Sequence, residues 1–156
     1  MTALIASPLA PTDRDLLISG VFHAPRARVF QVWTDVQHAK HWWAPRYFAV
    51  TACEIDCRVG GTWRVRIESP DWGVLWIRGT YLEIVAPERL VFTFATEDWY
   101  GEPGPETLVT VTFSDLGGAT MFTFSQGAFD DADTRNGHED GWISAFDMLA
   151  EYLARV

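Results

Sequence analysis

Hydrophobic and polar residues alternate along the middle of the chain in short runs that predict β-strands. The clearest run spans 62–68, where Trp63, Val65 and Ile67 fall on one face and charged residues fall on the other. Turn-forming pairs such as Gly60-Gly61 and Gly117-Gly118 separate such runs. The other predicted strands are 15–22, 50–59, 74–85, 90–96, 108–114 and 120–125.

Two short helices are predicted between the first and second strands. Pro25 suits the first turn of a helix, and Val29, Phe30 and Trp33 follow it at helical spacing. Thr34 or Asp35 can cap a second helix over 36–43, which Pro45 would end.

The longest predicted helix lies at the end of the chain, over 138–154. Trp142, Phe146, Leu149 and Leu153 recur there at helical spacing and form one apolar stripe. The order is therefore a strand, two short helices, six strands and a long helix. Strands grouped apart from helices favour an α+β fold with an antiparallel sheet, one face of which the long helix covers.

The length and charge of the chain limit the kinds of protein to which it can belong. With 156 residues, we expect one domain over 14–156, preceded by a flexible tail at 1–13. The net charge of −9, without any basic stripe, argues against nucleic-acid binding. No apolar run is long enough to enter a membrane, and the first residues lack the basic region of a signal peptide, so we expect a cytoplasmic protein.

The two cysteines fit that location. On one strand, the Cα atoms of Cys53 and Cys57 would lie about 13 Å apart, because each residue advances the strand by about 3.3 Å. A disulfide needs Cα atoms within about 7 Å, so we expect two free, buried thiols in a reducing compartment.

Several stretches together resemble one family. They are RDLLISGVFHAPRARVFQVWTDVQHAKHWWAP, VGGTWRVRIESPDWG, RGTYLEIVAPERLVFTF, TLVTVTFSDLGGATMFTF and GHEDGWISAFDMLAEYL. In this order they are similar to the bacterial homologues of the activator of the ninety-kilodalton heat-shock protein ATPase, within the START-like or SRPBCC superfamily. The resemblance covers about residues 14–155.

The resemblance implies a helix-grip fold, in which a seven-stranded antiparallel sheet wraps around the C-terminal helix and encloses a mostly apolar cavity. START-like relatives include lipid carriers, hormone receptors and aromatic polyketide cyclases or dehydratases. The family has no shared set of catalytic residues that could be assigned to positions of this chain.

Aromatic residues make up 14% of the chain and supply the candidate binding residues. Aromatic rings line ligand cavities, but they also fill cores, and both roles leave the same sequence pattern. The candidates for ligand binding are Trp43, Trp63, Phe94, Phe113, Phe124, His138, Trp142 and Phe146. Adjacent helical residues point about 100° apart, so Trp42 and Trp43 would face different surroundings; we expect Trp43 to be the more buried.

Two polar residues have two interpretations each. His138 shares a helix face with Trp142 and Phe146, so it is either the polar member of a cavity wall or a helix-start histidine bonded to backbone. Arg78 either points inward with Trp76 or lies on the surface while Ile77 and Tyr81 face the core. We favour the helix-start role for His138 and the surface for Arg78, since unpaired buried arginine is rare.

The sequence shows no pattern typical of a metal site, a cofactor site or a catalytic nucleophile. Asp35, His38 and His41 are spaced three residues apart without further ligands, so we expect no metal site. No Gly-x-Ser-x-Gly elbow or phosphate-binding glycine loop is present, and we assign no catalytic residue and no cofactor.

The sequence therefore predicts binding of a small hydrophobic or aromatic molecule between the sheet and the C-terminal helix. Two alternatives stay open: an enzyme of the polyketide cyclase or dehydratase type that uses the same cavity, and a co-chaperone-like interaction module. A homodimer is compatible with the sequence, and a chaperone partner is not favoured.

Overall fold

The described residues of the protein form one antiparallel sheet and three helices. The computed structural model describes residues 3–6 and 14–156. The strands are β1 (Ala3–Ala6), β2 (Leu16–Phe22), β3 (Ala49–Ile55), β4 (Thr62–Ser69), β5 (Gly73–Val85), β6 (Arg89–Thr96), β7 (Thr107–Asp115) and β8 (Thr120–Gly127). The helices are α1 (Arg26–Thr34), α2 (Val36–Ala39) and α3 (Ala132–Leu153).

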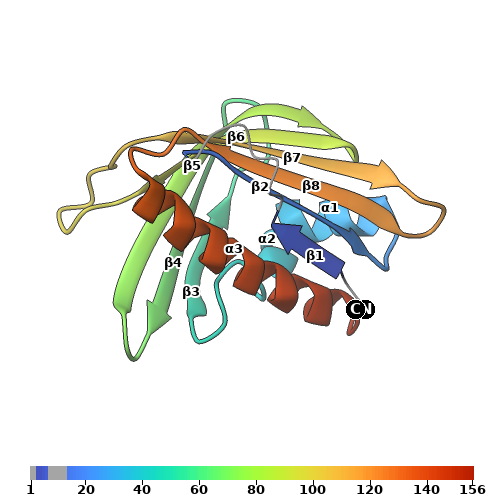
Figure 1. Ribbon diagram of the computed structural model, residues 1–156, viewed down its shortest axis with the longest axis horizontal. Coiled ribbons are helices and arrows are strands. Elements are labelled where there is room, and N and C mark those ends of the chain that lie inside the picture. Colours follow the sequence, from blue (N-terminus) through green and yellow to red (C-terminus); the bar gives the residue numbers. More distant parts are fainter. Residues whose placement is uncertain (1–2, 7–13) are drawn as a thin grey trace.

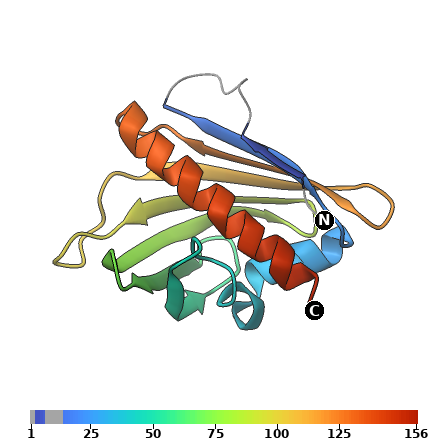
Figure 2. The same ribbon diagram turned by 60° about the horizontal axis from the view of Figure 1, so that its bottom comes forward.

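The sheet curves around the long C-terminal helix. Its strand order is β1-β2-β8-β7-β6-β5-β4-β3, and every neighbouring pair is antiparallel. Figures 1 and 2 show α3 running diagonally across the concave face, with α1 and α2 beside one end of it. The helix-grip architecture predicted from the sequence, with two short helices after the first long strand, is confirmed.

Period-two alternation assigns each strand an inner and an outer face, as in β4. Trp63, Val65 and Ile67 are buried toward α3, whereas Arg64, Arg66 and Glu68 point the other way. Strand β2, near the start of the domain, pairs with β8, the last strand before α3. Helix α3 therefore begins close to the sheet whose concave face it covers.

The core is centred on Trp33, which α1 presents to the sheet and which is 1% exposed. Its ring centroid lies within 6.4 Å of eight others, many of them tilted or edge-on, the arrangements that aromatic quadrupoles favour. These neighbours are Trp42, Trp43, Phe92, Phe113, Phe122, Phe124, Trp142 and Phe146. This end of the sheet is therefore filled with rings.

The Trp42-Trp43 pair lies outside a helix, which corrects the prediction of a helix over 36–43. Asp35 caps α2 as predicted, accepting a hydrogen bond from Gln37 N at 2.9 Å, but the helix ends at Ala39. The turn that follows allows both indoles to point inward. Trp42 is 1% exposed and Trp43 4%, so the expectation that Trp43 is the more buried is wrong.

Two other boundaries differ from the sequence prediction. Helix α3 begins at Ala132 because the Asp131 side chain accepts a hydrogen bond from Thr134 N at 2.7 Å and caps the polar first turn. Within the range predicted as a flexible tail, residues 3–6 form β1 on β2, which adds an eighth strand to the predicted seven. The rest of that range, 1–2 and 7–13, lies outside the described residues.

Candidate functional site

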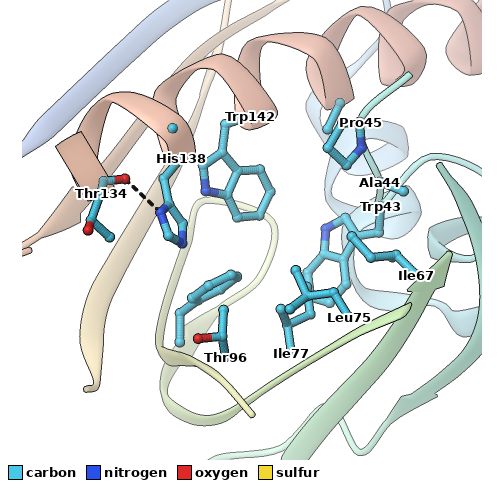
Figure 3. Close-up of a pocket in the computed structure, with 14 residues that line it drawn as sticks. Trp43, Ala44, Pro45, Ile67, Leu75, Ile77, Thr96, Thr134, His138 and Trp142 are labelled. Atoms are coloured by element: carbon cyan, nitrogen blue, oxygen red, sulfur yellow. Dashed lines mark hydrogen bonds between the residues drawn. The ribbon is translucent and has the colours of Figure 1, made fainter. Parts of the chain in front are cut away.

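A cavity of about 370 Å³ lies between α3 and the sheet. Its sheet side is lined by Ile67, Leu75, Ile77, Phe94 and Thr96, and one end is closed by Trp43, Ala44 and Pro45. Its helix side is lined by Thr134, Gly137, His138, Gly141, Trp142 and Ala145. Figure 3 shows these side chains converging from α3, from β5 and from the segment before β3. The volume falls in the range that holds a small organic molecule.

The cavity exists because α3 presents small residues to this part of the sheet. Gly137, Gly141 and Ala145 follow one another at four-residue spacing on the cavity side of the helix. A Cβ atom at Gly137 would meet nothing within 4 Å, and one at Gly141 would meet only Pro45 Cγ at 3.6 Å. Larger side chains at these positions would therefore occupy the space.

On the helix side of the cavity, the Trp142 side chain is held in place by a buried polar chain. Trp142 donates its indole N–H to Gln126 Oε1 at 2.7 Å, and Gln126 Nε2 donates to Thr107 Oγ1 at 2.8 Å. Thr107 in turn donates to the Phe94 carbonyl at 3.2 Å. With its N–H bonded to β8, Trp142 offers ring carbons to the cavity, in contact with Phe94 at 5.9 Å between centroids.

His138 combines both interpretations made from the sequence. Its Nδ1 lies 2.9 Å from the Thr134 carbonyl oxygen, one turn earlier in the helix, and its ring also lines the cavity. A carbonyl only accepts, so Nδ1 carries the hydrogen, and in the neutral ring Nε2 keeps its lone pair. Figure 3 shows Nε2 turned away from α3, on the side of Thr96.

The structure divides the eight candidate binding residues into two groups of four. Trp43, Phe94, His138 and Trp142 line the cavity. The others, namely Trp63, Phe113, Phe124 and Phe146, do not line it and are at most 1% exposed within the aromatic core. Residues that line a cavity and residues that fill a core follow the same hydrophobic periodicity. The sequence pattern could therefore not separate the four lining residues from the four core residues.

Several residues that line the cavity were not predicted from the sequence. Leu75 and Ile77 belong to a long strand whose favoured interpretation placed Ile77 inside without assigning either residue to the cavity, and Pro45 was treated only as a helix stop. A signal for the helix side was present: two glycines and an alanine at four-residue spacing are unusual inside a helix, where glycine costs about 0.5–1 kcal/mol relative to alanine.

Arg78 lies on the outer face of the sheet, as the favoured interpretation held, while Ile77 and Tyr81 are buried inside. Its neighbour Arg64 donates two hydrogen bonds to Glu97, at 2.7 and 2.8 Å, and its guanidinium stacks on Trp76 at 3.7 Å. The hydrogen bonds from Arg64 are the main reason that the pKa of Glu97 lies below its ordinary value.

Both cysteines are free, as expected, but their burial differs from the expectation. Cys53 on β3 is half-buried, and Cys57 is exposed, so the prediction of two buried thiols is wrong for Cys57. Burial raises the pKa of Cys53 to about 11. Within residues 3–6 and 14–156, no group of three metal-ligating side chains comes together. In the same part of the chain, no helix is long and apolar enough to cross a membrane.

The family follows from comparison with known proteins. The model of the family described as "Activator of Hsp90 ATPase homolog 1-like protein" matches residues 23–154, which include α1, α2, β3–β8 and α3. The chain belongs to this family. A comparison with functionally curated proteins gives no match.

Solved structures of similar proteins share the fold. The AHSA1 protein from Silicibacter pomeroyi is 23% identical with a TM-score of 0.83, over 90% of this chain and 97% of that one. A protein from Chromobacterium violaceum is 25% identical with a TM-score of 0.80, over 90% and 96% of the two chains. One from Arthrobacter aurescens is 22% identical with a TM-score of 0.82, over 99% and 92%. At this identity the likeness establishes the fold.

Proposed function

We propose that this protein binds a small hydrophobic or aromatic molecule in the cavity between α3 and β4–β6. The observation that carries the proposal is the cavity itself, about 370 Å³ in a domain whose remaining interior is tightly filled with rings. Burial of apolar ligand surface against Trp43, Phe94 and Trp142 supplies the free energy of binding, at about 25 cal/mol per Å².

The composition of the wall favours binding over catalysis. Among the described residues that line the cavity, none is a carboxylate, a cysteine, a lysine or an arginine, and His138 is the one titratable side chain. A cyclase or dehydratase would need a second group to exchange a proton with the substrate. We further propose that the protein acts in the cytoplasm, where free thiols such as Cys57 stay reduced.

Two substitutions at Gly141 test the site. Gly141→Leu would extend a side chain beside Pro45 and into the cavity, whereas Gly141→Ala adds only a Cβ atom that has ordinary contact distance to Pro45. We expect the leucine variant to bind the neutral fluorescent probe N-phenyl-1-naphthylamine at least about tenfold more weakly than wild type, a loss of about 1.4 kcal/mol. The alanine variant should bind normally and be about 0.5–1 kcal/mol more stable.

Native mass spectrometry before and after organic extraction identifies the natural ligand class. A small molecule of defined mass that leaves on extraction, and that the Gly141→Leu variant does not carry, would support the proposal. Probe binding that is equally strong in both Gly141 variants would show that the probe binds elsewhere and would overturn it.

A further inference from the structure

Three polar side chains of the cavity lie together at one end. Thr134 and His138 come from the first turns of α3, and Thr96 from the end of β6. The opposite end is closed by Ala44, Pro45 and Ile67, whose side chains have no polar atoms, and by Trp43, whose indole N–H is buried and has no hydrogen-bond partner in the described part of the chain. Figure 3 shows Thr134, His138 and Thr96 on one side of the view, with Pro45 and Ile67 on the other. A ligand that matches this wall is apolar along most of its length and polar at one end.

His138 is the group at the polar end whose hydrogen-bonding role is defined. The Thr134 carbonyl takes the Nδ1 hydrogen, which leaves Nε2 as an acceptor in the neutral ring. Phe94 and Phe129 hold the ring, with centroids 5.6 and 4.8 Å from that of His138. No hydrogen bond to Nε2 is formed by any residue in the described part of the chain. The lone pair is therefore positioned and available to a ligand.

Space is available beside this acceptor. A second cavity of about 80 Å³ shares Phe94, Thr96, Thr134 and His138 with the main one and continues toward Asp130. The imidazole of His138 thus lines both spaces. A short polar substituent on a ligand that fills the main cavity can reach the ring of His138 without displacing the helix.

The charges around the cavity disfavour two kinds of polar end on a ligand. A carboxylate would find no lysine or arginine among the described lining residues, and the chain carries a net charge of −9, so burying an anion there is unfavourable. An ammonium group would find no carboxylate among the described residues that line the main cavity, and Asp130, which lines the second cavity, is exposed to water. A neutral hydroxyl group carries no charge to desolvate and supplies the donor that Nε2 lacks.

We infer that the cavity selects aromatic molecules with a hydroxyl group at one end, which donates its hydrogen to His138 Nε2. The ring system lies against Trp43 and Trp142, and the hydroxyl oxygen is within reach of the Thr96 side chain. This inference rests on the proposed function and adds the ligand class to it.

A pair of probes tests the inference. 2-Naphthol and 2-methoxynaphthalene have similar shape and the same acceptor oxygen, but only 2-naphthol can donate a hydrogen bond. We expect wild-type protein to bind 2-naphthol about 3- to 10-fold more tightly, the range for one net neutral hydrogen bond. In His138→Phe, which keeps an aromatic ring between Phe94 and Phe129, the ratio should fall to about one through weaker binding of 2-naphthol.

His138→Gln and a spectroscopic measurement keep the test independent of how His138→Phe folds. Glutamine keeps an acceptor oxygen, so part of the preference for 2-naphthol should remain. The ¹⁵N resonance of His138 Nε2 in wild type should shift when 2-naphthol is added and stay in place with 2-methoxynaphthalene. Equal affinities for the two probes in wild type, or an unchanged Nε2 resonance, would overturn the inference while leaving the cavity as a binding site. Failure of both probes to bind would instead contradict the proposed function.

Discussion

The indole N–H of Trp142 and the side-chain oxygen of Gln126 form a buried hydrogen bond of 2.7 Å that joins α3 to β8. Gln126 is 1% exposed, and its side-chain amide also donates a hydrogen bond to Thr107 on β7. Thr107 also donates to the Phe94 carbonyl on β6, so one helix and three strands share a single polar chain inside an apolar core. The bond fixes the position of the Trp142 ring, which forms a wall of the cavity.

Replacing Gln126 by methionine should destabilise the protein and loosen this wall. The substitution keeps the volume but leaves the Trp142 N–H and the Thr107 hydroxyl without their partner inside the core. We expect a loss of about 1–3 kcal/mol in the free energy of unfolding, measured by urea titration. Affinity for N-phenyl-1-naphthylamine should also fall.

The matched control for this prediction is Gln37→Met on α2. Gln37 is exposed, and its side chain accepts one surface hydrogen bond from Lys40. Its substitution should change stability by less than about 0.5 kcal/mol. If Gln126→Met were as mild as this control, the buried chain would not hold the helix to the sheet.

Truncation of Trp33 should remove the centre of the aromatic core. The side chain is 1% exposed and its ring has eight aromatic neighbours within 6.4 Å, so Trp33→Ala leaves a cavity that these rings cannot fill. We expect a cost of about 3–5 kcal/mol in urea or thermal unfolding. Trp99→Ala, at a residue 95% exposed in the loop between β6 and β7, should cost less than about 0.5 kcal/mol.

The fold was predictable from the sequence because its signals are local. Alternation in 62–68 correctly placed Trp63 inside and Arg64 outside. The boundaries that were wrong depend on contacts formed only in the folded chain. The helix over 36–43 ends at Ala39, where Trp42 turns inward and donates its N–H to the Val32 carbonyl at 2.8 Å.

The cavity was only half predictable, for a geometric reason. Phe94 and Phe124 both point inward from strands and both contact Trp142, at 5.9 and 4.6 Å between ring centroids, yet of these two only Phe94 also lines the cavity. The side chains that lie opposite an inward-pointing residue depend on how α3 crosses the sheet. The sequence of a single strand does not determine that crossing. The spacing of Gly137 and Gly141 in the helix was the sequence feature that marked the space.

The two thiols should differ in reactivity toward Ellman's reagent. Burial raises the pKa of Cys53 to about 11, so at pH 8 about one molecule in a thousand carries the reactive thiolate there. The pKa of Cys57 is also raised by burial of the thiol, but its side chain is accessible. We therefore expect a faster phase from Cys57 and a slower one from Cys53, the latter accelerating about tenfold per unit of pH.

The variants Cys57→Ser and Cys53→Ser assign these phases. Removal of Cys57 should abolish the faster phase in native protein, and both thiols should react at similar rates in concentrated urea, where burial is lost. A fast phase that survives in Cys57→Ser would mean that β3 opens readily and that Cys53 is not protected by the sheet.

The protein should become less stable in acid, because protonation of Glu97 weakens its pair with Arg64. Glu97 has a side chain that is 1% exposed, and the hydrogen bonds from Arg64 lower its pKa below the ordinary 4.5. A carboxyl whose pKa is lower in the folded state stabilises the fold fully above its unfolded pKa and loses that contribution as the pH falls through the folded pKa. The free energy of unfolding should therefore decrease below about pH 4.5, and Glu97→Gln should flatten this part of the profile.

At neutral pH, Glu97→Gln should cost about 1 kcal/mol, because the side chain of Arg64 is 40% exposed and water replaces part of what it loses. Glu88→Gln is the matched control: its carboxylate lies 3.8 Å from Arg26 and is 56% exposed, so its removal should cost less than about 0.5 kcal/mol. Urea titrations of wild type and both variants between pH 3 and pH 7 measure these effects. An acid-side slope that is as steep in Glu97→Gln as in wild type would assign the acid sensitivity to other carboxyl groups.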